Sequence, residues 1–95
     1  MILGKVIGTV WSTRKDENLV GMKFLIVKHL KLDYTEKDAF TVAVDSVGAG
    51  VGEVVLFAQG SSARQTKITK NKPVDAVIMA IVDKLDVNGK SVKDE

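Results

Sequence analysis

The sequence predicts a mainly β protein: a small five-stranded β-barrel of OB-like type with one or two short helices. Five segments are rich in β-branched and large apolar residues, which is the composition typical of strands. Short polar or glycine-containing stretches join these segments, with no long amphipathic helix between them. Glycines within the first segment allow the strong curvature that a small barrel requires.

The five expected strands follow one another in a single domain of residues 1–95, in an apparently antiparallel order. They cover residues 2–11, 21–28, 40–45, 53–58 and 77–84. In the first strand, period-two alternation predicts that Gly4, Val6, Gly8 and Val10 share one face, opposite Lys5, Ile7, Thr9 and Trp11. The strand patterns also predict that the three phenylalanines, Phe24, Phe40 and Phe57, fill the core.

Helical structure is expected in two short places. One is a turn starting near 61–64 with a serine N-cap, and the other follows Pro73, with Asp75 in the first turn. An Asn88-Gly89 pair predicts a terminal hairpin, so that about 86–95 forms a hairpin and tail whose last residues, 90–95, fray.

Composition predicts a homo-oligomer. Hydrophobic residues make up 45% of the chain and cysteine is absent. A domain of this size has a limited core, and here no disulfide, metal or cofactor is expected to reinforce it. Burying apolar surface against further copies of the chain supplies roughly 25 cal/mol per Å² instead.

The chain is expected to be soluble and cytoplasmic. It begins with a strand-like run and shows no basic leader or cleavage site, and no apolar stretch approaches the roughly 18 residues that span a bilayer. The net charge of +2 does not require a polyanionic partner. We interpret the basic cluster Lys67, Lys70 and Lys72 as part of a solvated loop.

The glycine-rich stretch 47–53 superficially resembles a phosphate-binding loop. A dinucleotide-binding loop would lead into a helix, whereas this one leads directly into the strand that starts near Val54. We therefore predict a tight turn in which glycines adopt positive φ.

No catalytic constellation is evident, and the chain is predicted not to be an enzyme. The single histidine, His29, lacks a nearby acid in sequence and is interpreted as a strand-end or surface residue. Ser61 and Ser62 lack an evident base. Asp45 and Asp75 are flanked by apolar residues, so they are either buried or semi-buried structural carboxylates that accept backbone amides, which we favour, or a catalytic pair.

An OB-like single-stranded nucleic-acid-binding or interaction module is the alternative function. Such barrels bind bases on exposed aromatic side chains beside a basic groove. Trp11 and Tyr34 are the available platforms, but neither neighbours the lysine cluster in sequence. Nucleic acid is therefore disfavoured as a partner. A membrane is disfavoured as well, because no segment combines helical length with a strong apolar stripe.

Three stretches together resemble the vertex-protein family of bacterial microcompartments, found in carboxysomes and in ethanolamine-type metabolosomes. They are GKVIGTVWSTRKDENLVGMKFLIVK, VAVDSVGAGVGEVVLFAQGSSAR and PVDAVIMAIVD. The resemblance implies an OB-like barrel that assembles into pentamers, caps the vertices of a polyhedral shell and contacts hexameric shell proteins. Trp11 is bulkier than the family pattern implies at the end of the first strand.

The resemblance also implies candidate interface residues. The matching positions form a glycine-rich turn and a short helix, both expected near subunit contacts or the axial opening. They are Gly48, Ala49, Gly50, Gly52, Ser61, Ser62, Ala63 and Arg64. Arg64 is expected to donate hydrogen bonds to an adjacent subunit.

Overall fold

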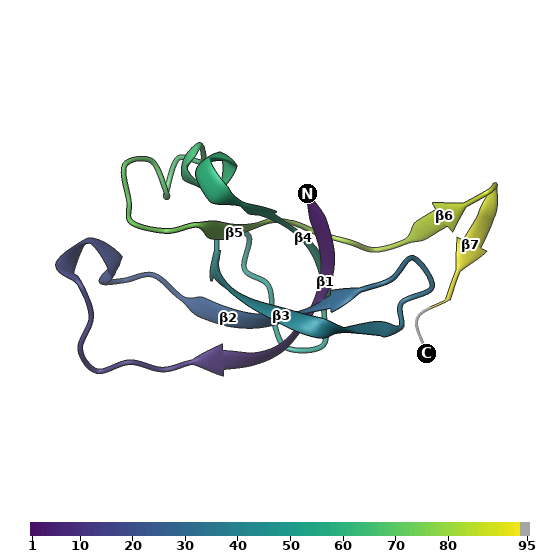
Figure 1. The fold of residues 1–95 in the computed structure, drawn as a ribbon, viewed down its shortest axis with the longest axis horizontal. Coiled ribbons are helices and arrows are strands. Elements are labelled where there is room, and N and C mark those ends of the chain that lie inside the picture. Colours follow the sequence, from purple (N-terminus) through teal and green to yellow (C-terminus); the bar gives the residue numbers. More distant parts are fainter. Residues whose placement is uncertain (94–95) are drawn as a thin grey trace.

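The computed structural model describes residues 1–93, which fold into a closed five-stranded barrel with a two-stranded hairpin at its C-terminal end (Figure 1). The barrel order is β1-β2-β3-β5-β4. The strands are β1 (Ile2–Val10), β2 (Phe24–Leu30), β3 (Glu36–Asp45), β4 (Val54–Gln59) and β5 (Ala76–Ile81). The OB-like mainly β fold predicted from the sequence is therefore confirmed.

The expected all-antiparallel order is wrong for one pair of neighbouring strands. β3 and β5 pair in parallel, through Val44 opposite Val77 and Asp45 opposite Ile78. A closed ring with an odd number of strands cannot alternate direction throughout, so one neighbouring pair must run parallel. The connection that places β5 between β3 and β4, which we call the crossover, covers 60–75 and joins β4 to its antiparallel neighbour β5.

Several strand ends differ from the prediction. β2 begins three residues later than expected, because Gly21 adopts a φ of 87° in the preceding turn. β3 begins four residues earlier, since Glu36 pairs with Leu30 and continues the ladder through polar residues. β1 ends at Val10 and β5 at Ile81, so Trp11 and residues 82–84 lie outside strands.

A bulge in β1 also overturns the predicted alternation. The register with β2 shifts between Val6 and Gly8, leaving Ile7 exposed. An extra residue in one strand moves every later side chain to the opposite face. Val6 therefore faces the interior as predicted, whereas Val10 pairs with the outward-facing Phe24.

The barrel interior is filled by one apolar cluster built from all five strands and the turn before β4. Its buried members are Val6, Leu25, Val27, Ala43, Ala49, Val55, Phe57, Ala76 and Ile78. Phe57 confirms the prediction for the phenylalanines. Phe40 contradicts it with 64% exposure, because it lies opposite Lys28 on the outer face of β3. Phe24 is half-buried, packed against the outside of the barrel.

A second, outer cluster lies beneath the long crossover. It joins Val44, Ala58, Ala63, Val74 and Val77, with Leu19, Met22 and Phe24 packed against it. The 3-10 helix η2 (Gly60–Arg64) lies over β4 and β5, which confirms the predicted helix there. A further 3-10 turn, η1 (Glu17–Leu19), was not predicted and is capped by the Asp16 carboxylate.

The helical turn expected after Pro73 is absent from the described chain. Val74 is buried in the outer cluster, and the Asp75 carbonyl accepts a hydrogen bond of 2.7 Å from the Gly60 amide. These contacts hold the segment extended as it enters β5. None of the helices within residues 1–93 is long and apolar enough to cross a membrane.

The predicted terminal hairpin is confirmed. β6 (Leu85–Val87) and β7 (Lys90–Val92) pair antiparallel around Asn88 and Gly89, which have φ values of 54° and 77°. The hairpin stands away from the barrel in Figure 1, and the molecule is accordingly elongated, with extents of 45 × 24 × 22 Å. Of the segment 90–95 expected to fray, residues 90–92 form β7 and 94–95 lie outside the described residues.

Substitution of Gly4 by Ala should destabilise the barrel. A Cβ there would lie 2.4 Å from Val27 Cγ1 and 3.0 Å from the Lys28 carbonyl oxygen. Overpacking of this kind costs about 1–3 kcal/mol. Gly8→Ala is the matched control, because its nearest neighbour is the flexible Ile26 Cδ1 at 3.4 Å. Urea unfolding of both variants tests this, and equal midpoints would contradict it.

Candidate subunit interface

The glycine-rich turn is anchored to the barrel by its own carboxylates. Asp45 accepts backbone amides from Val47 and Ala49, each at 3.1 Å. Glu53 Oε1 accepts the Gly50 amide at 2.7 Å. Ala49 is only 1% exposed and its side chain belongs to the inner core. The turn therefore closes one end of the barrel.

This geometry explains the glycines and opposes a phosphate-binding role. Gly48 and Gly52 adopt φ values of 77° and 94°, as predicted for a tight turn. The Gly52 amide bonds to the Val6 carbonyl at 2.8 Å, which ties the turn to β1. Two of the amides that would face an anion, those of Ala49 and Gly50, are bound to carboxylates, whose charge would repel phosphate.

The second motif, η2, rests on the outer cluster. Ala63 is fully buried there, whereas Ser61, Ser62 and Arg64 are exposed. The predicted serine N-cap is wrong: the helix begins at Gly60, and the preceding Gln59 makes no side-chain capping bond. Arg64 Nη1 donates to the Val74 carbonyl at 3.1 Å, within the same chain.

The two motifs do not converge on one cluster. Ala49 packs among the inner residues, whereas Ala63 packs on the outside of the barrel, beneath the crossover. The eight residues singled out from the sequence therefore occupy two separate places in the subunit. Each motif presents exposed positions, at Gly48, Val51 and Gly52 in the turn and at Ser61, Ser62 and Arg64 in the helix.

The remaining polar candidates have structural surroundings. His29 lies near the end of β2, as predicted. Its Nε2 is 2.7 Å from Thr41 Oγ1, and its ring tilts against Phe57 at 5.3 Å. Gln59 also donates to Thr41, at 3.2 Å. By strand direction this polar group lies at the barrel end opposite Ala49, where it covers the core.

The two aspartates have different environments. Asp45 is half-buried and accepts backbone amides, as the structural interpretation predicted. Asp75 is exposed, contrary to the expectation of burial, because only its backbone joins the crossover. In the β2–β3 turn, the Thr35 hydroxyl and amide lower the pKa of the exposed Asp33 carboxyl by hydrogen bonding. Within residues 1–93, no cluster of three potential metal ligands occurs.

The aromatic platforms considered for nucleic acid do not lie together. Trp11 is 89% exposed and follows β1, whereas Tyr34 is half-buried in the turn after β2. Because β1 and β2 are antiparallel, the segments that follow them lie at opposite ends of the barrel. The arrangement does not form a continuous surface for stacking bases.

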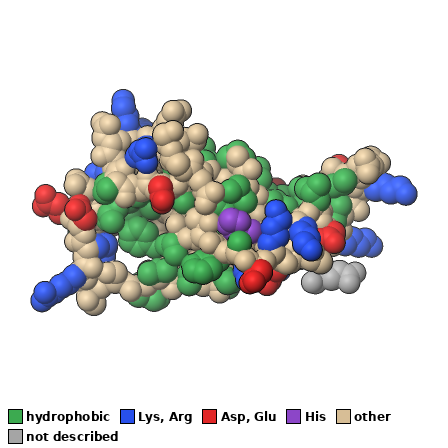
Figure 2. Space-filling model, viewed as in Figure 1, with side chains coloured by type: hydrophobic (Ala, Val, Ile, Leu, Met, Phe, Trp, Pro, Cys, Tyr) green, Lys and Arg blue, Asp and Glu red, His purple; other side chains and the backbone are tan. Residues whose placement is uncertain are grey.

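The sequence analysis missed an apolar surface on the outside of β1, β2 and β3, which we name the sheet patch. It comprises Val10, Ile26, Phe40 and Val42, of which Phe40 and Val42 are 64% and 41% exposed. Figure 2 shows hydrophobic side chains gathered over the region of β2 and β3. The β1 bulge and the outward orientation of Phe40 create this surface, and neither is evident from strand patterns alone.

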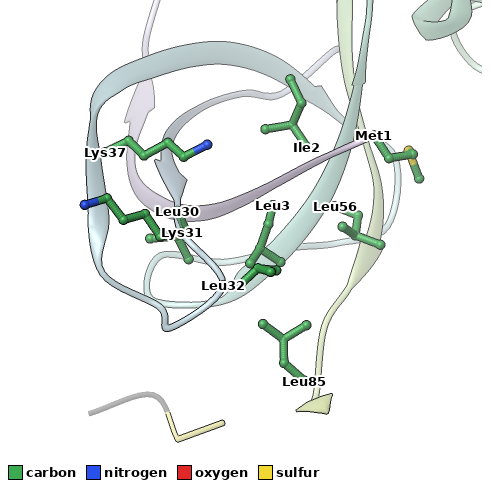
Figure 3. A pocket seen from close by; sticks show the side chains of 9 residues that line it. All are labelled: Met1, Ile2, Leu3, Leu30, Lys31, Leu32, Lys37, Leu56 and Leu85. Atoms are coloured by element: carbon green, nitrogen blue, oxygen red, sulfur yellow. The ribbon is translucent and has the colours of Figure 1, made fainter. Parts of the chain in front are cut away.

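A second apolar surface lies at another place on the barrel, beside the hairpin, and we name it the end pocket. It has a volume of about 410 Å³ and is lined by Met1, Ile2, Leu3, Leu30, Lys31, Leu32, Lys37, Leu56 and Leu85. Leu3 and Leu32 point into the same space, and Leu85 faces them from the hairpin side (Figure 3). The two lysines are its charged members.

Together, the closed barrel, the anchored glycine-rich turn and two unlike apolar surfaces define a small OB-like protein suited to binding further protein. Comparison with known proteins identifies its family. Residues 1–83 match the EutN_CcmL family model, described as "Ethanolamine utilisation protein EutN/carboxysome". The chain belongs to this family, which confirms the resemblance found in the sequence.

Individual relatives agree with this assignment. The carboxysome shell vertex protein CcmL of Synechococcus elongatus is 44% identical over 95 residues, covering 100% of this chain and 96% of the relative. The structure of CcmL from Nostoc sp. PCC 7120 has a TM-score of 0.94 at 40% identity, covering both chains fully. The pentameric microcompartment shell protein GrpN from Rhodospirillum rubrum has a TM-score of 0.83 at 46% identity, covering 92% of this chain and 100% of GrpN.

Removal of the Asp45 carboxylate should loosen the glycine-rich turn. Asp45→Ala leaves the Ala49 amide without its partner, and losing hydrogen bonds to a charged group costs about 1.5–3 kcal/mol. Asp75→Ala, at an exposed carboxylate, should change stability by less than about 0.5 kcal/mol. Denaturant titrations and amide exchange at Ala49 would measure this. An Asp45→Ala protein as stable and protected as Asp75→Ala would refute the anchoring role.

Proposed function

We propose that this chain is a structural shell protein that assembles as a cyclic pentamer and caps the vertices of a polyhedral bacterial microcompartment. The observation that carries the proposal is full-length similarity to shell vertex proteins, including a relative described as pentameric. The shell of a microcompartment is accordingly the expected location. Its contribution there is closure and exclusion, not catalysis.

The two apolar surfaces support a cyclic arrangement. In a head-to-tail ring, each subunit uses one surface toward the subunit before it and a different surface toward the subunit after it. The sheet patch and the end pocket are two such surfaces, built from different residues. Covering them would remove exposed side chains such as Phe40 and Leu32 from water, which stabilises a small barrel with a limited core.

The proposal extends to hexameric shell proteins as partners. Hexagonal tiles alone form a flat sheet, and five-fold units at the corners allow a closed polyhedron. A pentamer at a corner would meet hexamers around its rim. The absence of an evident catalytic constellation in the sequence agrees with this structural role.

We assign the exposed positions of the glycine-rich turn and of η2 to subunit contacts or to the rim of the axial opening. The anchored turn presents Gly48 and Gly52 with no side chain, which permits close approach of another backbone. Arg64 carries five N–H donors, and its intrachain bond to Val74 uses one nitrogen. The guanidinium can therefore also bind a carbonyl or carboxylate of an adjacent subunit.

The native mass is the direct test of the proposed assembly. We expect five times the 10.3 kDa chain by native mass spectrometry and light scattering. The mass should persist in moderate salt, because apolar burial is only weakly screened. A protein that stays monomeric at high concentration would contradict the pentamer, and a salt-dependent affinity for single-stranded DNA or RNA would then support the nucleic-acid alternative.

Arg64→Ala should weaken the pentamer. We expect the concentration of half-dissociation to rise roughly tenfold or more, since a guanidinium contact is lost at every interface. Arg64→Lys should rescue it only in part, because an ammonium lacks the planar fork. Arg14→Ala, an exposed arginine in the β1–β2 connection, is the matched control. A dilution series by light scattering compares them, and unchanged dissociation of Arg64→Ala would remove Arg64 from the interface.

A further inference from the structure

The C-terminal hairpin is amphipathic. Its register places Leu85 opposite Val92 and Val87 opposite Lys90, so these four side chains share one face. Asp86 and Ser91 form the other face, where the Ser91 hydroxyl donates to Asp86 at 3.1 Å. One side of the hairpin is therefore apolar with a single lysine, and the other is polar.

This hairpin has little to support it within its own chain. An isolated two-stranded hairpin is at best marginally stable in water and normally needs an apolar surface beneath it. Leu85 lines the end pocket with Val92 opposite it, but Val87 lies next to the hairpin turn, and the hairpin as a whole stands away from the barrel (Figure 1). The hairpin also lies beyond residues 1–83, the part matched by the family model.

The sheet patch offers a surface of matching chemistry. Phe40 is 64% exposed in the single chain, so the chain's own hairpin does not cover the sheet patch. Asp38 lies two residues before Phe40 on β3 and is exposed, in the stretch 36–40 where the register with β2 shifts. An apolar hairpin face carrying Lys90 thus complements an apolar sheet patch that has the exposed Asp38 nearby on β3.

We propose that the hairpin of one subunit lays its apolar face on the sheet patch of the next subunit in the ring. This inference rests on the proposed pentamer and specifies its interface. The occupant of the sheet patch is a second copy of this chain. Because the hairpin and the sheet patch are different surfaces, the contact is head-to-tail and can repeat around a closed ring.

Disulfide trapping tests the pairing in a chain that has no native cysteine. Three single variants are made: Phe40→Cys on the sheet patch, Val87→Cys on the apolar hairpin face, and Ser91→Cys on the polar face as control. Purified variants are mixed in pairs, dissociated, reassembled and oxidised. Because each chain carries one cysteine, a disulfide can form only between chains.

The mixture of Phe40→Cys with Val87→Cys should yield covalent dimers on a non-reducing gel. We expect roughly tenfold more dimer than in the mixture with Ser91→Cys, because disulfides require closely spaced Cβ atoms. Neither Phe40→Cys nor Val87→Cys alone should form dimers, since identical surfaces do not meet in a head-to-tail ring. All positions are exposed or half-buried, so the folds should survive.

The outcomes separate this inference from the proposed function. If the variants are pentameric by native mass but the 40–87 mixture gives no more dimer than the control, the hairpin pairing is overturned and the pentamer stands. If the unsubstituted chain is not pentameric, the proposed function fails first. Dimers formed by Phe40→Cys alone would indicate a two-fold contact and would also overturn the pairing.

Discussion

Closure of a five-stranded barrel around Phe57 is the constraint from which the other features of this subunit follow. With an odd number of strands, one seam must be parallel, and the pairing of β3 with β5 meets this requirement. β3 is joined to β5 through β4 and the crossover 60–75, which buries Ala63 and Val74 against the outside of the barrel. The close approach of Gly4 to Val27 lets β1 complete the ring.

The same closure decides what is left exposed. An interior this small accommodates a limited set of side chains, so several large apolar residues of the strands must face outward. The bulge in β1 moves Val10 to the outer face, where it lies with Ile26, Phe40 and Val42. The sheet patch is thus a consequence of barrel geometry, and it gives the proposed ring an apolar surface to bury.

Polar groups in this subunit mainly fix backbone geometry. Asp45 and Glu53 hold the glycine-rich turn, Asp16 caps η1, and Arg64 joins η2 to Val74 at the far end of the crossover. His29, Thr41 and Gln59 cover one end of the core through mutual hydrogen bonds. Such rigid turns and helices are what a shell subunit needs, because neighbouring subunits must meet surfaces of fixed shape.

Strand composition was sufficient to predict a mainly β barrel. The glycine-rich stretch predicted a tight turn, and the Asn88-Gly89 pair predicted the terminal hairpin. These features could be predicted because they depend on local propensity and turn chemistry. Three matching stretches were sufficient to predict the family. The tertiary structure decided three other features: the parallel pairing of β3 with β5, the exposure of Phe40 and Asp75, and the separation of Ala49 from Ala63. Each is set by strand register and barrel closure, which join residues far apart in sequence and leave no local signal.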